Sequence, residues 1–83
     1  MDNGEKIGKI THFFPKINVA VVELSKDLRN GDRIRIEGRG QKFEQVVESM
    51  QIEHQNIPHA KPGDSVGMKV SQPVKPGDIV YKV

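Results

Sequence analysis

Three copies of a Gly-Asp turn constrain this chain more than any other feature. Each copy follows a turn-forming residue, at Asn30-Gly31-Asp32, Pro62-Gly63-Asp64 and Pro76-Gly77-Asp78. Proline presets φ for the first central position of a turn, and glycine supplies the positive φ that a type II turn needs. Each turn is followed by a short alternating or β-branched run, which is typical of a strand. The runs are 33–36, 65–70 and 79–83.

Two more strands are expected upstream of the first Gly-Asp turn. Residues 6–13 and 17–24 have strand character and are separated by a turn at Phe14-Pro15-Lys16. Residues 25–30 are expected to form a connector with at most one short helical turn. Short strands bounded by turn signals every eight to twelve residues indicate a small barrel or sandwich.

One stretch in the middle of the chain favours a helix by its pattern. Phe43, Val46, Val47 and Met50 recur at the i, i+3, i+4 and i+7 spacing of an amphipathic helix. The neighbouring Gln and Glu residues add helix propensity. A strand in the same place requires Val46 and Val47 to straddle a β-bulge, with Met50 and Ile52 pointing inward. The residue pattern alone leaves both structures open.

The size and composition of the chain bound its function. With 83 residues and a mass of 9.3 kDa, a single domain over residues 1–83 is expected, with a disordered N-terminus at residues 1–5. A domain of this size has a thin core, which leaves no room for a large internal active site. There is no cysteine and no signal peptide or long apolar run. We therefore expect a cytoplasmic monomer that does not contact a membrane.

Motifs for enzymatic chemistry are sparse. The sequence has no phosphate-binding P-loop and no cysteine nucleophile, and no serine lies in a nucleophile elbow. Glu53, His54 and His59 lie close enough in sequence to form a fragment of a metal site or a shallow hydrolase site. Scattered surface residues are the simpler interpretation. The sequence therefore predicts a protein that is not an enzyme and holds no metal or cofactor.

A cluster of basic residues is the strongest binding signal from the residues themselves. Residues 1–42 carry nine basic and six acidic residues, a balance of +3, whereas residues 43–83 carry four and five, a balance of −1. On a strand, Arg33 and Arg35 point to one face while the intervening isoleucines face the core. Arg39 lies at the tip of the expected hairpin, and Lys42 follows it.

Two functions are open for this cluster. Guanidinium groups aligned on a strand can bind phosphates as bidentate forks. The same side chains can instead form a solvated face, with Glu37 and Asp32 as ion-pair partners. On the first interpretation Arg33, Arg35, Arg39 and Lys42 contact RNA phosphates.

The dipeptide Phe13-Phe14, followed by proline, is a second candidate surface. On a strand end, the two rings must face opposite sides of the sheet. The outward ring can stack on a base or anchor a protein partner. Packing of both rings in a partly covered core is the structural alternative.

The middle and end of the chain resemble the second, β-barrel domain of translational GTPases such as elongation factor Tu. The matching residues are Val47 to His54, which resemble that domain's V-K-S-V-E-M-H-H strand, and Ala60 to Gly67, which resemble its A-x-P-G-D-N-V-G turn. Small free-standing translation elongation factor-like proteins share these motifs. The C-terminal domain of the collagenase-like peptidase family is similar too.

This resemblance implies a fold and a function. The fold is all-β, a small closed antiparallel barrel of six or seven strands, and the stretch from Phe43 to Met50 is a strand in it. The chain has no GTPase domain, so the implied role is a non-enzymatic RNA- or ribosome-binding module that contacts tRNA or ribosomal RNA, with Lys9 and Phe14 as helpers. The alternative is a protein–protein interaction module, accessory to a peptidase-like or RNA-modifying partner, that binds through Phe13 and Phe14.

Overall fold

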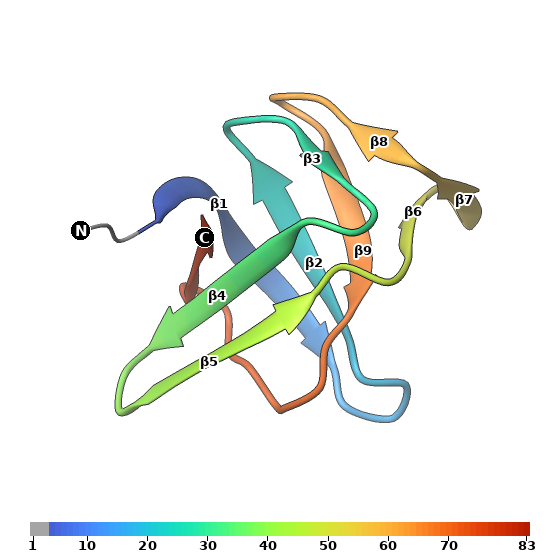
Figure 1. Ribbon diagram of the computed structural model, residues 1–83. Helices are drawn as coiled ribbons and strands as arrows, with labels where there is room; N and C mark the ends of the chain where they lie inside the picture. Colours follow the sequence, from blue (N-terminus) through green and yellow to red (C-terminus); the bar gives the residue numbers. More distant parts are fainter. Residues whose placement is uncertain (1–3) are drawn as a thin grey trace.

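The computed structural model describes residues 4–83, which fold as antiparallel β-structure (Figure 1). The described strands are β1 (Glu5–Phe14), β2 (Val19–Leu24), β3 (Leu28–Arg29), β4 (Arg33–Gly38), β5 (Gln41–Val46), β6 (Met50–Ile52), β7 (Gln55–Ile57), β8 (His59–Ala60), β9 (Ser65–Lys69) and β10 (Ile79–Lys82). The all-β prediction is confirmed. Within the described range, no helix is long and apolar enough to cross a membrane.

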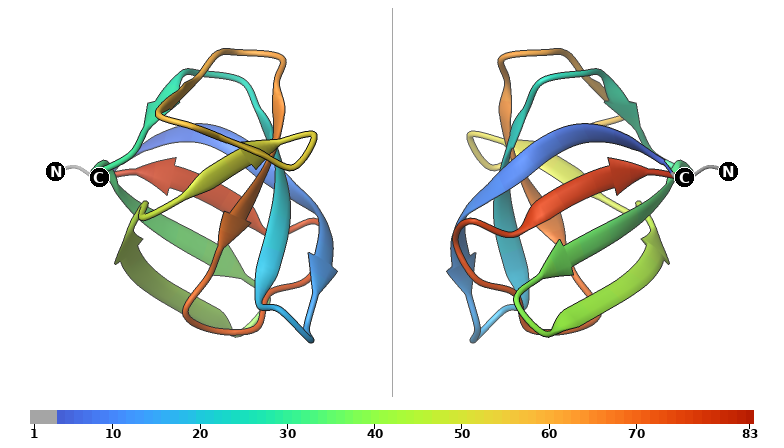
Figure 2. Two further views of the ribbon diagram at one scale, coloured as in Figure 1. Left: turned by 90° about the vertical axis from the view of Figure 1, so that its right-hand side faces the viewer. Right: turned by 90° about the vertical axis from the view of Figure 1, so that its left-hand side faces the viewer.

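Eight of the strands form one sheet, in the order β5-β4-β10-β1-β2-β9-β6-β7. The sheet is strongly curved, so that its inner faces surround the core (Figure 2). The short strands β3 and β8 pair separately and lie across one end of the molecule (Figure 1). Leu28 and Ala60, which are paired there, are both fully buried. The small second sheet therefore closes that end of the core.

The expected closed barrel of six or seven strands is not found. The main sheet has eight strands, and in residues 4–83 its two end strands, β5 and β7, do not pair with each other. Side-chain amides bridge part of the gap instead. The Gln45 amide donates to the Lys69 carbonyl and accepts from the Ser71 N–H, both at 2.8 Å. The Gln41 amide donates to the Pro73 carbonyl at 2.6 Å. These glutamines connect β5 to the segment after β9 where backbone pairing stops.

The stretch with the helical pattern is extended, but it is not the single strand that the resemblance implied, because β5 ends at Val46 and β6 begins only at Met50. Val46 ends β5 with 43% of its surface exposed, whereas Val47 is buried and bonded to the first Gly-Asp turn. The Val47 N–H donates to the Asp32 carbonyl, and the Val47 carbonyl accepts from the Gly31 N–H, each at 2.8 Å. These non-local bonds outweigh the local helical spacing, because helix propensity is a weak preference that tertiary contacts override.

The three Gly-Asp turns share one hydrogen-bonding pattern. Each aspartate carboxylate accepts from the backbone N–H three residues earlier, at 3.0, 2.9 and 3.0 Å for Asp32, Asp64 and Asp78. Each turn glycine has a φ between 93° and 99°. Each glycine N–H also donates to a distant carbonyl: Gly31 to Val47, Gly63 to Leu24, and Gly77 to Ile10. The turns therefore fasten separate strands together as well as reversing the chain.

The core is apolar throughout the described residues. Its fully buried members include Ile7, Ile10, Val22, Leu28, Ile34, Ile36, Val66, Met68 and Val80. No polar or charged residue of the range 4–83 is buried. Of the residues expected to be disordered at the N-terminus, 1–3 lie outside the described part. Glu5 begins β1 and pairs with Lys82. All polar chemistry in the described part therefore lies at the surface.

Candidate functional site

Four of the five predicted phosphate-binding cations lie on one outer face of the sheet. The registers of β5, β4, β10 and β1 place residues in rows across these strands. One row is Lys42, Glu37, Ile79 and Lys9, the next is Glu44, Arg35, Tyr81 and Lys6, and Arg33 lies opposite Val46. We call this surface the basic face. Only the strand order brings Lys9 and Lys6 beside the arginines, so sequence reasoning missed Lys6 and the central Tyr81.

The two strand arginines of the basic face are paired with carboxylates. Arg33 Nε lies 2.9 Å from Glu44 Oε1, and Arg35 Nε lies 2.6 Å from Glu37 Oε2. The Arg35 guanidinium also lies over the Tyr81 ring, 5.1 Å from its centroid. The Arg33–Glu44 pair is exposed, and exposed ion pairs contribute little to stability, whereas the Arg35–Glu37 pair is partly buried. Both pairs partly neutralise the face. The predicted Glu37 pairing is observed, whereas Asp32 lies 3.6 Å from Lys82 rather than beside an arginine.

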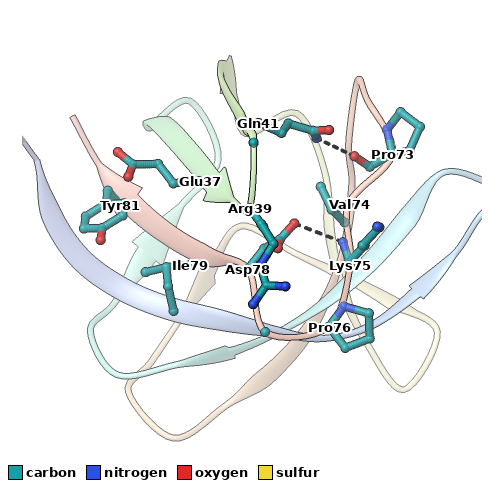
Figure 3. A pocket seen from close by; sticks show the side chains of 13 residues that line it. Glu37, Arg39, Gln41, Pro73, Val74, Lys75, Pro76, Asp78, Ile79 and Tyr81 are labelled. Carbon is teal, nitrogen blue, oxygen red and sulfur yellow. Dashed lines mark hydrogen bonds between the residues drawn. The ribbon is translucent and has the colours of Figure 1, made fainter.

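Arg39 lies in a groove at the edge of the basic face. The groove has a volume of about 730 Å³ and separates the tip of the β4–β5 hairpin from the loop before β10 (Figure 3). Lys75 and Asp78 also line it. Within the part of the chain that the structure describes, neither Arg39 nor Lys42 makes an ion pair. These two cations are therefore available to an anionic ligand.

In the groove, Gly38 at the end of β4 lies against the third Gly-Asp turn. The Asp78 carboxylate, which accepts the Lys75 N–H at 3.0 Å, lies directly against the backbone of Gly38. A Cβ at position 38 would overlap all three atoms of that carboxyl group. Hence a side chain at position 38 would force the Asp78 carboxylate or the hairpin tip to move.

The Phe13-Phe14 hairpin has the expected opposite orientation of its rings. Phe13 is half-buried and packs against the core, whereas Phe14 is 49% exposed. The rings of Phe14 and His12 stack with their centroids 6.5 Å apart. Sequence reasoning missed Ile17, which is 60% exposed because β2 begins only at Val19. Asn18 was a signal in the sequence, because asparagine tolerates positive φ better than most residues. Its φ here is 55°, which lengthens the turn.

Glu53, His54 and His59, which were considered for a metal or hydrolase site, do not all lie in the same part of the fold. Glu53 and His54 lie in the turn between β6 and β7, and both have positive φ. His59 lies in β8, where its Nε2 is 3.5 Å from Asp27 Oδ2. A backbone hydrogen bond, and then the bond to His59, lower the pKa of Asp27 below its ordinary value. Over residues 4–83, no group of three or more His, Asp or Glu side chains is placed to hold a metal ion.

The fold and these surfaces define a small all-β module whose polar chemistry lies on the outside of a curved sheet. No family model matches the chain. It is 44% identical over 77 residues to an uncharacterised protease of Methanocaldococcus jannaschii, a match that covers 92% of this chain and 19% of that protein. The chain therefore spans about a fifth of the length of that curated relative.

Two solved structures support the same relationship. Both are crystal structures of the C-terminal domain of a Geobacillus thermoleovorans "putative U32 peptidase", and both are 27% identical to this chain. One has a TM-score of 0.90 and covers 94% of this chain and 99% of that domain. The other has a TM-score of 0.89 and covers 95% and 92%. The chain is thus similar to a domain of peptidase-named proteins.

These comparisons correct the resemblance to the elongation factor Tu barrel domain. The relatives are named as proteases or putative peptidases, so the assignments to translation and to elongation factors are wrong. The structure explains the error. The Ala60 to Gly67 motif contains a Gly-Asp turn, and this chain uses the same turn three times for backbone reasons alone. Turn chemistry of this kind specifies a local shape and does not identify a function.

Proposed function

We propose that this chain is a non-enzymatic accessory module that docks onto a peptidase-like protein. The observation that carries the proposal is the match of nearly the whole chain to about one fifth of a protease. The similarity to a crystallised C-terminal domain of a second peptidase-named protein supports it.

A hybrid protein tests this proposal. The matching region of the Methanocaldococcus protease is replaced by this chain, and amide hydrogen exchange is measured in the hybrid and in the isolated chain. A docked module loses solvent access on one surface, so we expect exchange in some outer strand or turn to slow by about tenfold or more in the hybrid. Equal exchange rates throughout the chain in both proteins would mean that the module hangs free, which contradicts the proposal.

RNA binding is the second candidate function. It is favoured by Arg39 and Lys42, which lie close together on the β4–β5 hairpin without ion-pair partners among residues 4–83. Lys9 lies on the same outer face in β1, which β10 separates from β4. The phosphate backbone supplies most of the affinity in such contacts, which makes the affinity steeply dependent on salt.

Fluorescence anisotropy with bulk tRNA tests the RNA candidate. The change is Arg39→Ala/Lys42→Ala, and the control is Lys26→Ala/Lys61→Ala, which removes the same charge elsewhere. If the pair contacts phosphates, the first variant lowers the slope of log affinity against log salt by about 1.4 to 1.8, and the control leaves it unchanged. Equal slopes in both variants, or no binding at low salt, would rule this site out.

A further inference from the structure

We propose that an apolar patch on the outside of β1, β2 and β9 is the surface that docks on the peptidase-like partner. The inference rests on the proposed function and names the part of the chain that carries it. The patch consists of Phe14, Ile17, Val19 and Val21 around the bare backbone of Gly67. The partner surface it fits is apolar, with carboxylates facing the hairpin end of the patch.

The strand registers make the patch continuous. On the outer face, Phe14 of β1 lies opposite Val19 of β2, and His12 lies opposite Val21. Val21 in turn lies opposite Gly67 of β9. A Cβ at Gly67 would lie 3.5 Å from the Val19 side chain, so the glycine backbone lies directly beside the two valines. Outward positions of a strand usually carry polar residues, but here Phe14 on β1 and Val19 and Val21 on β2 are apolar.

The hairpin tip extends the patch into solvent. The Ile17 N–H donates to the Phe14 carbonyl at 3.2 Å, which closes a tight turn and places the two residues at its ends. Ile17 and Phe14 are the two most exposed large hydrophobic residues described, at 60% and 49%. An aromatic ring and a branched chain that project together from a rigid hairpin resemble the anchors found at the centres of protein interfaces.

The hairpin end of the patch is basic. Lys16 lies in the hairpin turn, and Lys69 lies opposite Val19 on β9. The other end is mixed, because Glu23 follows Val21 on the outer face of β2 and lies opposite Lys9 and Ser65. Complementary potentials steer partners and fix their orientation. The basic hairpin end therefore favours a partner surface with carboxylates beside an apolar centre.

The basic hairpin end argues against a second copy of this chain as the occupant. In a two-fold symmetric contact centred on Phe14 and Ile17, the same surface meets itself. Lys16 lies between these two residues in the sequence, so the contact would bring the two copies of Lys16 together, and like charges placed together at an interface are unfavourable. A different protein with acidic residues suits both the apolar centre and the basic end, and the peptidase-like partner is the one that the comparisons favour.

The experiment uses the hybrid described above. Three versions of this chain are compared within it: the unchanged sequence, Phe14→Ser/Ile17→Ser, and the control Val83→Ser. Val83 is also an exposed hydrophobic residue, at 42%, but it follows β10, where its N–H donates to the Arg33 carbonyl, away from the β1–β2 hairpin. We expect the peptide covering residues 11–22 to exchange about tenfold more slowly in the unchanged hybrid than in the isolated chain. Phe14→Ser/Ile17→Ser should abolish that protection, and Val83→Ser should retain it.

Other results would distinguish the accessory role from the choice of the apolar patch as its docking site. Protection confined to another surface, such as the basic face, would leave the accessory role intact and overturn the apolar patch as its site. No protection anywhere would overturn both. If bulk tRNA, and not the hybrid, protects residues 11–22 in a salt-sensitive way, the patch binds RNA and the inference fails. The melting temperatures of the isolated variants must match that of the unchanged chain, because the substituted side chains are exposed.

Discussion

Replacing Gly8 by alanine is expected to lower the free energy of unfolding by about 3 kcal/mol. Gly8 lies in β1 beside β2, where an added Cβ would come within 2.7 Å of the Glu23 carbonyl oxygen and 2.9 Å of the Val22 side chain. The oxygen belongs to the backbone of the neighbouring strand, which cannot move without disturbing the ladder. A domain of this size has only about 4 to 12 kcal/mol of stability to lose.

Gly67→Ala is the matched control for this prediction. It also adds one methyl group to a strand of the same sheet, but the nearest atoms lie at 3.5 and 3.9 Å, which are ordinary contact distances. We expect the control to stay within about 0.5 kcal/mol of the unchanged protein, because strand glycines are otherwise replaceable. Urea unfolding followed by circular dichroism measures both. Similar losses for Gly8→Ala and Gly67→Ala would show that the close approach of β1 to β2 is not the cause.

Replacing Gly38 by alanine is expected to lower the free energy of unfolding by about 2 kcal/mol. A second substitution should remove part of this loss. The new methyl group overlaps the Asp78 carboxylate in the groove. Asp78→Ala alone should cost about 1 kcal/mol, because the Lys75 N–H loses its acceptor. In the double variant the overlap is absent, so its loss should be smaller than the sum of the single losses by about 1 to 2 kcal/mol.

Asp64 provides the control for this coupling. Its carboxylate accepts the Lys61 N–H at 2.9 Å, as Asp78 does with Lys75, but it makes no contact with Gly38. Asp64→Ala combined with Gly38→Ala should therefore be additive. Additive behaviour of the Asp78 pair as well would mean that the hairpin tip relaxes away from the turn.

The strands and turns of this protein could be predicted because their signals are local. The turns at Gly31, Gly63 and Gly77 occur where the sequence places glycine between a turn former and aspartate. The opposite orientation of Phe13 and Phe14 follows from strand alternation alone. In contrast, the helical spacing of Phe43 to Met50 is misleading, because bonds from Val47 to the distant Asp32 and Gly31 decide its structure.

The surfaces could be predicted only in part, because they depend on which strands are neighbours. Arg33 and Arg35 share a face by alternation, but Lys9 joins them only because β10 lies between β4 and β1. The apolar patch likewise requires β9 to lie beside β2, which places Gly67 opposite Val21. The unpaired edge of β5 could not be predicted either, because no local signal in the sequence shows that a strand lacks a neighbour on one side.

The glutamine bridges at that unpaired edge have a consequence for the protein at high concentration. An unpaired strand edge offers its backbone groups to strands of other molecules and so promotes intermolecular sheet growth. Gln45 and Gln41 hold the segment after β9 across β5 through side-chain amides that mimic peptide groups. Slow hydrolysis of the Gln45 amide to a carboxylate would remove its donor to Lys69 and leave an anion facing a carbonyl oxygen. Chemical ageing at this one residue would then weaken the cover over the edge and favour self-association in a chain that is otherwise correctly folded.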